Sequence, residues 1–163
     1  LALPPNEVAA LIPELIVPTE TRPIINVHFR LNTHTPLPND APFIGVVNGT
    51  SQWVFRRGDI FSVTVSNAVA LIDHSAEELA MKIWLEVVRI IKQKEKPLPP
   101  YRVLKERRAT IAQTPTQDAL RPDSATKWEN LHLAGDWTNT GLPATIEGAV
   151  QSGQIAAETI QNR

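Results

Sequence analysis

The sequence predicts an α+β fold, in which a mostly antiparallel sheet is flanked by helices. Three stretches carry this prediction. Residues 25–65 contain short apolar runs with strand periodicity, and residues 75–92 contain apolar positions spaced as on one face of a helix. Residues 130–157 combine a short apolar run, a turn of small residues and a second helical pattern.

Composition places the chain among soluble globular domains. Its 163 residues, 42% of them hydrophobic and 20% charged, suffice for one domain with a buried core. A net charge of −1 argues against a nucleic-acid partner, which needs a basic face to neutralise phosphates. Without cysteine there is no disulfide or thiolate chemistry, so any electron carrier must be a cofactor. No apolar run approaches the roughly 20 residues of a membrane span and no signal peptide is visible, which predicts a cytoplasmic location.

The N-terminal third begins with a short helical pattern and continues into a strand. The helical pattern at residues 6–12 ends at Pro13 and is expected to be a surface helix. Residues 25–31 alternate strictly between apolar and polar positions, as in a half-buried strand. His28 on the polar side has no other metal-binding residue at ligand spacing, so no metal site is predicted.

Two apolar runs, 43–47 and 51–55, flank the pair Asn48-Gly49. This pair favours a type I′ turn and therefore an antiparallel hairpin. With the runs at 25–31 and 61–65, we expect a meander of about four strands with one apolar face. Trp53 and Phe55 share one face, which we expect to serve mainly as core and partly as the wall of a tunnel for a long apolar substrate.

A helix is predicted over about residues 75–92, because Ser75 and Glu78 form a capping-box pattern. Lysines at its end favour the helix C-terminus electrostatically and usually mark a solvated end, with docking on anionic lipid as the weaker alternative: Lys92, Lys94 and Lys96. Residues 101–110 alternate apolar and basic positions as in a strand with a charged face. Residues 113–126 lack periodicity and are expected to form a loop.

The stretch 130–157 has the features of a ligand-binding turn. We expect a strand at residues 131–134 that ends at Gly135 and Asp136, where glycine lets backbone approach a bulky group and aspartate presents a carboxylate. Pro143 suits the first turn of the following helix, whose free N–H groups attract oxygen-rich or anionic ligands. From the residue types alone, an ordinary strand–helix unit in which Asp136 caps a turn is an equally good interpretation.

This last helix carries two stripes of residues at helical spacing. The apolar stripe is expected to face a core and consists of Ile146, Ala149, Val150, Ala157 and Ile160. The second stripe is a flat ridge that another backbone can approach closely, made of Gly148, Ser152 and Ala156.

The wording of this stretch, L-A-G-D-W-T-x-T-G-L-P-A-T-I-E-G-A-V-x-S-G, resembles the C-terminal flavin signature of phytoene-desaturase and amine-oxidase-like flavoproteins. It is most similar to the squalene-associated branch, the hydroxysqualene dehydroxylases. The resemblance implies FAD as cofactor, with Asp136 on the ribityl chain and the backbone at 144–146 on the flavin N1/O2 edge. The FAD-binding residues it implies are Gly135, Asp136, Ala144, Thr145, Ile146 and Ala149.

A second stretch, Y-R-V-L-K-E-R-R-A-T followed by T-P-T-Q-D-A-L-R-P, resembles the same branch. The resemblance implies that residues 1–126 belong to a substrate domain, with the sheet at about 23–67, and that residues 127–163 complete an FAD-binding Rossmann-like domain. The G-x-G-x-x-G unit of that domain is absent, and Met81 is the only methionine, so we expect the chain to be part of a larger protein. Alone, it should be inactive and bind FAD weakly or not at all.

The activity implied is reductive dehydroxylation of hydroxysqualene to squalene, with an apolar isoprenoid as substrate. Two alternatives stay open: another flavin amine oxidase-like oxidoreductase of the same fold, such as a carotenoid (phytoene-type) desaturase, and a non-catalytic lipid-binding or interaction domain. No catalytic residue is assigned, since His28, Arg30 and Arg108 are only weak candidates for the proton donor. Peripheral membrane contact and self-association of the isolated chain are further expectations.

Overall fold

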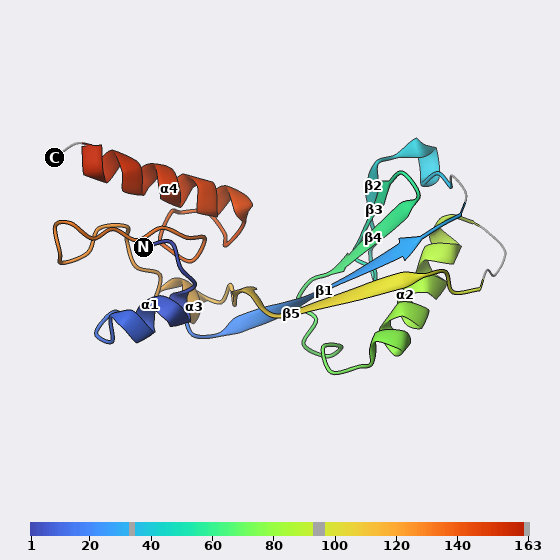
Figure 1. Ribbon diagram of the computed structural model, residues 1–163, viewed down its shortest axis with the longest axis horizontal. Helices are drawn as coiled ribbons and strands as arrows, with labels where there is room; N and C mark the ends of the chain where they lie inside the picture. The colour runs from blue at the N-terminus through green and yellow to red at the C-terminus, as the bar shows by residue number, and fades with distance from the viewer. Residues whose placement is uncertain (33–34, 93–96, 162–163) are drawn as a thin grey trace. The chain divides into compact units, whose positions relative to one another are not determined.

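The computed structural model describes residues 1–32, 35–92 and 97–161 (Figure 1). The chain forms two compact units, one of Leu1–Thr21 with Thr110–Arg163 and one of Arg22–Ala109. The boundary predicted at residue 126 divides the chain by expected function, whereas the compact units divide it at residues 21–22 and 109–110. The boundary at residue 126 stays a prediction. The elements in chain order are α1 (Pro5–Leu11), β1 (Thr21–Arg30), the 3-10 turn η1 (Pro38–Asp40), β2 (Phe43–Gly45), β3 (Trp53–Arg57), β4 (Ile60–Val65), α2 (Ala76–Ile90), β5 (Tyr101–Ile111), α3 (Pro115–Asp118) and α4 (Ile146–Gln161).

The strands form one sheet in the order β2-β3-β4-β1-β5. The pairs β2–β3, β3–β4 and β1–β4 are antiparallel, as predicted for the fold class. The expected simple meander is wrong in one respect, because β1 pairs with β4 rather than with β2. Burial explains this: β1 carries three fully buried side chains, whereas β2 is short and mostly exposed and so suits an edge.

Helix α2 covers one face of the sheet (Figure 1). Its predicted capping box is present, since the Ser75 hydroxyl accepts from the Glu78 N–H and the Glu78 carboxylate accepts from the Ser75 N–H. Leu79, Ile83 and Val87 of the predicted stripe are buried against the sheet. Burying each such side chain contributes about 1.5–3 kcal/mol to folding.

The loop between β2 and β3 corrects the predicted turn. Asn48 has a left-handed φ of 61°, but the hairpin closes through the Val46 N–H and the Gln52 carbonyl, so the connection is longer than a two-residue type I′ turn. The carboxylate of Glu86 on α2 accepts from the N–H groups of Thr50 and Ser51, at 3.1 and 2.7 Å. This helix-to-loop contact holds the wider loop open.

The face that carries Trp53 and Phe55 is also corrected. Val54 between them is fully buried on the α2 side of the sheet, so the two aromatic side chains point to the opposite face. Trp53 is 44% exposed. The expected main role of these two residues in the core is therefore wrong.

In the other unit, a second core gathers residues from α1, the end of β5 and the segment before α4: Val8, Ile12, Val17, Ile111, Leu133, Trp137 and Ala144. The loop expected at 113–126 contains one helical turn, α3, capped by the Thr114 hydroxyl. Gln117 in this turn accepts from the N–H groups of Thr19 and Glu20 through its side-chain oxygen.

The strand expected at residues 131–134 is not a regular strand. His132 makes one isolated antiparallel bridge, to Ala125. On the other side, the amino group of Leu1 donates to the carbonyl of His132 and Ala134 N–H donates to the carbonyl of Leu1, which is a parallel hydrogen-bond pattern. The segment is extended, but it bridges to one residue on each side, Ala125 and Leu1, which is too few to form a ladder of strand pairs.

Of the two stripes on α4, the small-residue ridge faces the protein interior and the apolar stripe faces solvent. The flat ridge of Gly148, Ser152 and Ala156 is buried, as predicted. The apolar stripe is exposed instead of facing a core, with Ile146 at 86% and Val150 at 52% exposure. Because the ridge side chains are small, the backbone at Gly135 and Pro143 lies close to the helix on that side. The larger apolar side chains are left on the exposed side.

Over the described parts of the chain, no helix combines the length and hydrophobicity needed to cross a membrane.

Candidate functional site

The turn at Gly135 is built against helix α4. Gly135 has φ 156°, and a Cβ placed there would lie 2.5 Å from the indole nitrogen of Trp137. Its N–H donates to the Ser152 hydroxyl at 2.8 Å, and that hydroxyl donates to the Ala149 carbonyl at 2.7 Å. The buried Trp137 is fixed in turn, because its indole N–H donates to the Leu3 carbonyl at 2.9 Å. Glycine is required here by a neighbouring side chain and by the backbone conformation.

Thr145 caps the start of α4. Its hydroxyl accepts from the Gly148 N–H at 3.2 Å, and its carbonyl accepts from the Ala149 N–H at 2.9 Å. Gly148 allows this turn to approach the preceding chain, since a Cβ there would lie 2.6 Å from the Pro143 carbonyl oxygen. Ala144, just before the helix, is buried, whereas Ile146 at its first position is exposed.

Asp136 follows the glycine and is half-buried. Burial raises the pKa of its carboxyl group above the usual aspartate value. The N–H groups of Asp136 and Trp137 and the positive charge of Arg121 offset part of that effect. A carboxyl group held in such a place is stabilised in its charged form by any ligand that donates hydroxyl hydrogen bonds to it.

Arg121, which the sequence analysis did not single out, organises the loop between the turn and α4. Its side chain is only 6% exposed and donates to three backbone carbonyls, those of Asp136 (3.1 Å), Thr138 (2.6 Å) and Leu142 (2.8 Å). It also pairs with the exposed carboxylate of Asp118 at 3.0 Å. Periodicity cannot reveal a buried arginine in a loop. Its only signal was its place in the second stretch of family-like sequence.

The structure thus gathers the predicted site residues at two adjoining places within one unit. Gly135 and Asp136 form the turn, and Ala144, Thr145, Ile146 and Ala149 form the start of α4. Ser152 links them by bonding to both Gly135 and Ala149. This arrangement can present N–H groups and one carboxylate to a ligand that has both carbonyl and hydroxyl oxygens, as a flavin has.

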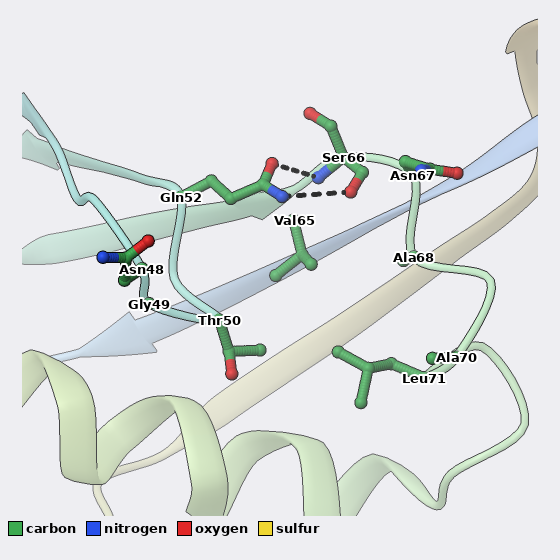
Figure 2. Close-up of a pocket in the computed structure, with 10 residues that line it drawn as sticks. All are labelled: Asn48, Gly49, Thr50, Gln52, Val65, Ser66, Asn67, Ala68, Ala70 and Leu71. Atoms are coloured by element: carbon green, nitrogen blue, oxygen red, sulfur yellow. Dashed lines mark hydrogen bonds between the residues drawn. The ribbon is translucent and has the colours of Figure 1, made fainter.

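The other unit contains a cavity of about 310 Å³ beside the β2–β3 loop (Figure 2). The Gln52 side chain spans one wall, accepting from the Ser66 N–H at 2.9 Å and donating to the Ser66 carbonyl at 3.2 Å. The lining residues are Asn48, Gly49, Thr50, Gln52, Val65, Ser66, Asn67, Ala68, Ala70 and Leu71. None of these side chains is charged or nucleophilic enough to act as an acid, base or attacking group, so the cavity is not a catalytic candidate.

The weak candidates for a proton donor occupy ordinary positions on the sheet. His28 on β1 lies 2.9 Å from the Ser62 hydroxyl, measured from Nδ1 to Oγ. Arg30 pairs with Asp59 at 3.0 Å in an exposed contact, and Arg108 lies on the exposed part of β5. Among residues 1–32, 35–92 and 97–161, no group of three His, Asp or Glu side chains is placed to hold a metal ion.

Comparison with known proteins identifies the family. A family model described as flavin containing amine oxidoreductase matches residues 2–161. The chain therefore belongs to the flavin containing amine oxidoreductase family, and the family predicted from the flavin signature is confirmed.

Individual relatives show which members of this family the chain resembles. The chain is 48% identical over 160 residues to the hydroxysqualene dehydroxylase of Rhodopseudomonas palustris (strain ATCC BAA-98 / CGA009), a match covering 98% of this chain and 37% of that protein. It is 32% identical over 152 residues to the 15-cis-phytoene desaturase of Synechococcus elongatus (strain ATCC 33912 / PCC 7942 / FACHB-805), covering 85% of this chain and 32% of that protein. The chain thus spans about a third of the length of both relatives.

A solved structure confirms the α+β fold class. A crystal structure from Exiguobacterium sp. 255-15, described as a candidate protoporphyrinogen oxidase, superposes with a TM-score of 0.68 at 14% identity. The superposition covers 99% of this chain and 40% of that one. At this identity the likeness concerns the fold alone.

Proposed function

We propose that the protein containing this chain is an FAD-dependent oxidoreductase that converts hydroxysqualene to squalene. The observation that carries the proposal is the 48% identity to a hydroxysqualene dehydroxylase over 98% of the chain. The identity falls to 32% for a phytoene desaturase. Both named relatives act on long isoprenoids, so the apolar substrate class is common to them.

We infer that residues 127–163 supply the C-terminal part of the FAD site. The Asp136 carboxylate would accept a hydrogen bond from a ribityl hydroxyl, and the N–H groups at the start of α4 would meet the flavin's carbonyl edge. Gly135 and Ala149 would provide the close packing that brings the turn to the helix. Since the chain lacks a G-x-G-x-x-G segment, its own affinity for FAD should be weak.

The chemistry that FAD supplies when bound and reduced is a hydride for the carbon that loses hydroxide. The carbon–oxygen bond breaks, a carbon–hydrogen bond forms, and a proton joins the departing oxygen to give water. The contribution of this chain is to orient the cofactor through the Gly135–Asp136 turn and, through its sheet, to bind substrate. No residue is assigned as the proton donor.

The test uses the full-length protein loaded with FAD, reduced without oxygen and given hydroxysqualene, with products read by mass spectrometry. Squalene is the expected product, and an Asp136→Asn protein should form it more slowly because it holds less flavin. A flavin-loaded protein that forms no squalene but desaturates phytoene would replace the proposal by the desaturase function. A folded protein that holds no FAD at any concentration would favour the non-catalytic lipid-binding role.

A cytoplasmic location with peripheral contact at a membrane surface is part of the same proposal. Of the three lysines that motivate it, Lys94 and Lys96 lie outside the described residues, and Lys92 follows α2 with a left-handed φ of 51°. The full-length protein should sediment with vesicles containing anionic lipid and release at high salt. Equal sedimentation with neutral vesicles would argue against an electrostatic contact.

A further inference from the structure

The guanidinium group of Arg121 places a positive charge inside the unit that contains the Gly135–Asp136 turn. The Arg121 side chain is only 6% exposed. Its terminal nitrogens donate to the carbonyls of Asp136, Thr138 and Leu142, and its buried Nε atom has no hydrogen-bond partner among the described residues. The three acceptors are neutral, so these hydrogen bonds hold the side chain without neutralising its charge.

The carboxylate that pairs with Arg121 lies on the solvent side. The side chain of Asp118 is 67% exposed, and its Oδ1 atom is 3.0 Å from Nη1 of the arginine. Water screens an exposed carboxylate, so this pair contributes little inside the protein. A charge taken out of water is costly unless an opposite charge accompanies it. The buried side of Arg121 therefore favours a negatively charged group in the site beside it.

The charge of Arg121 acts on the residue that the proposed function places next to the cofactor. Burial is the largest influence on the pKa of the Asp136 carboxyl group and raises it, whereas the positive charge of Arg121 lowers it. The electric field of the arginine thus extends past the backbone carbonyls that it binds.

Arg121 is bonded to both ends of the loop that joins the two parts of the proposed FAD site. Its acceptor Asp136 belongs to the turn assigned to the ribityl chain. Its acceptor Leu142 lies two residues before Ala144, where the segment assigned to the flavin's carbonyl edge begins. One buried cation therefore lies beside the loop between these two places.

A positive charge at this position distinguishes between the two redox states of a flavin. Reduction adds two electrons and one proton to FAD, which leaves one negative charge on the flavin ring at neutral pH. Charged groups near the ring alter its reduction potential for this reason. Because a buried charge is screened less than an exposed one, a cation acts here at a range of several ångströms.

We propose that Arg121 raises the reduction potential of the bound flavin, because its buried positive charge stabilises the anionic reduced cofactor. The inference rests on the proposed function, since it takes FAD and its placement from there. It goes further by assigning an effect on the redox state to a residue outside the flavin signature. Arg121 acts across the loop, so it is a positioning and electrostatic residue rather than a catalytic one.

The test measures the reduction potential of FAD bound to the full-length protein. Dithionite supplies the electrons without oxygen, a redox dye of known potential is the reference, and absorbance reports both. Arg121→Gln keeps an amide donor but removes the charge. It should lower the affinity for reduced FAD relative to oxidised FAD by about tenfold, which is a fall of about 30 mV for a two-electron couple.

Two variants separate the charge from the hydrogen bonds. Arg121→Lys keeps the charge and loses the fork of donors, so its potential should stay near the wild-type value although it retains less flavin. Asp118→Asn removes the exposed partner and should leave the potential unchanged. A purely structural role of Arg121 would alter how much flavin is retained without moving the potential of the flavin that remains bound.

The wild-type protein gives a measurement that does not depend on the folding of any variant. Its potential should lie above that of free FAD in the same buffer, because the site should bind the reduced form more tightly than the oxidised form. A wild-type potential below that of free FAD would overturn the inference, even if no Arg121 variant folded.

The outcomes separate this inference from the proposed function. If both Arg121 variants hold less FAD at an unchanged potential, or if both lower the potential equally, the charge has no such effect and the inference is wrong. The function still stands in that case if squalene forms. If the potentials follow the expected order but no squalene forms, the proposed reaction is wrong and the inference stands. A folded full-length protein that holds no FAD would contradict both.

Discussion

The guanidinium group of Arg121 donates to the backbone carbonyl of Asp136 at 3.1 Å, and so a residue outside the flavin signature fixes its central turn. The same group binds the carbonyls of Thr138 and Leu142, which brings three points of one loop to a single buried side chain. The position of the Asp136 carboxylate therefore depends on a residue fifteen positions earlier in the chain. The forked N–H donors of the arginine side chain, rather than regular secondary structure, hold this loop in place.

Replacing Arg121 should destabilise this loop first. We expect Arg121→Gln to lower the free energy of unfolding by about 3 kcal/mol, since carbonyls that had charge-assisted bonds lose them inside the protein. Arg121→Lys, which keeps the charge but not the fork, should cost about half as much. Urea denaturation at pH 7 measures both, and flavin retention in the full-length protein should fall in the same order.

Asp118 gives the matched control for that series, because it pairs with Arg121 from an exposed position. Asp118→Asn should change stability by less than about 1 kcal/mol. A cost for Asp118→Asn equal to that of Arg121→Gln would show that the ion pair, and not the carbonyl contacts, holds the arginine.

Asp136→Asn should separate stability from cofactor binding. Burial raises the pKa of Asp136, so the folded chain binds this proton more tightly than the unfolded chain does. Stability is therefore lost as pH rises from the ordinary aspartate pKa through the raised one. The Asn variant should lack this loss and be at least as stable at pH 7 without flavin. In the full-length protein it should bind flavin less tightly, by about 1–3 kcal/mol if a charged-group hydrogen bond is lost.

Two measurements on the wild-type and Asp136→Asn proteins check this prediction. The first is denaturation from about pH 3 to about pH 8, a range that brackets the usual aspartate pKa of about 3.9. The second is a flavin titration. An Asn variant that loses stability at pH 7 and keeps its flavin affinity would make Asp136 a structural cap. That outcome would restore the ordinary strand–helix interpretation of the stretch.

Glu86 should produce the opposite pH dependence. Burial alone would raise the pKa of its carboxyl group, but hydrogen bonds from Ser51 and Thr50 outweigh it and hold the pKa below the usual glutamate value. The stabilisation is present above the ordinary glutamate pKa and is lost as pH falls through the lowered one. Glu86→Gln should cost about 1–2 kcal/mol at pH 7 and flatten the acid limb of the stability profile.

Glu77, an exposed residue in the first turn of α2, supplies the control for charge. Glu77→Gln should cost about 0.3–1 kcal/mol through the helix dipole alone. Chemical denaturation between about pH 3 and pH 7, a range that spans the usual glutamate pKa, measures both variants. Equal profiles for the two would mean that the loop contact of Glu86 contributes nothing beyond its charge.

Two glycines in α4 offer a test of the close-packed ridge within a single helix. A Cβ at Gly148 would lie 2.6 Å from the Pro143 carbonyl oxygen, whereas a Cβ at Gly153 would meet nothing within 4 Å. Gly148→Ala should therefore destabilise the chain by about 1–3 kcal/mol. Gly153→Ala should stabilise it by about 0.5–1 kcal/mol, because alanine is the better helix former. Thermal unfolding of both variants measures these changes in stability. A stabilising Gly148→Ala would contradict the close packing of Gly148 against Pro143.

The sequence could predict the elements whose signals are local. The alternation around Val27 and Phe29, the capping box at Ser75 and the small-residue ridge of α4 each depend on near neighbours, and all three are present. The failures depend on distant partners. The turn at Asn48 is widened by Glu86 on α2, and Trp53 faces outward because Val54 takes the place in the core. The role of Arg121 also came only from the structure, because its three carbonyl partners lie 15 to 21 residues away.

The exposed stripe of α4 leads to a prediction about the isolated chain. Ile146, Val150 and Ile160 present branched apolar side chains to solvent along one side of the helix. We expect two copies to bury this stripe against each other, so the sedimentation coefficient should rise with concentration. Val150→Lys should shift the chain toward monomer, because a charge would be buried in the contact. Glu158→Lys, also exposed on α4 but outside the stripe, should leave the association unchanged. A wild-type chain that stays monomeric at its highest soluble concentration would show that the stripe alone does not drive self-association.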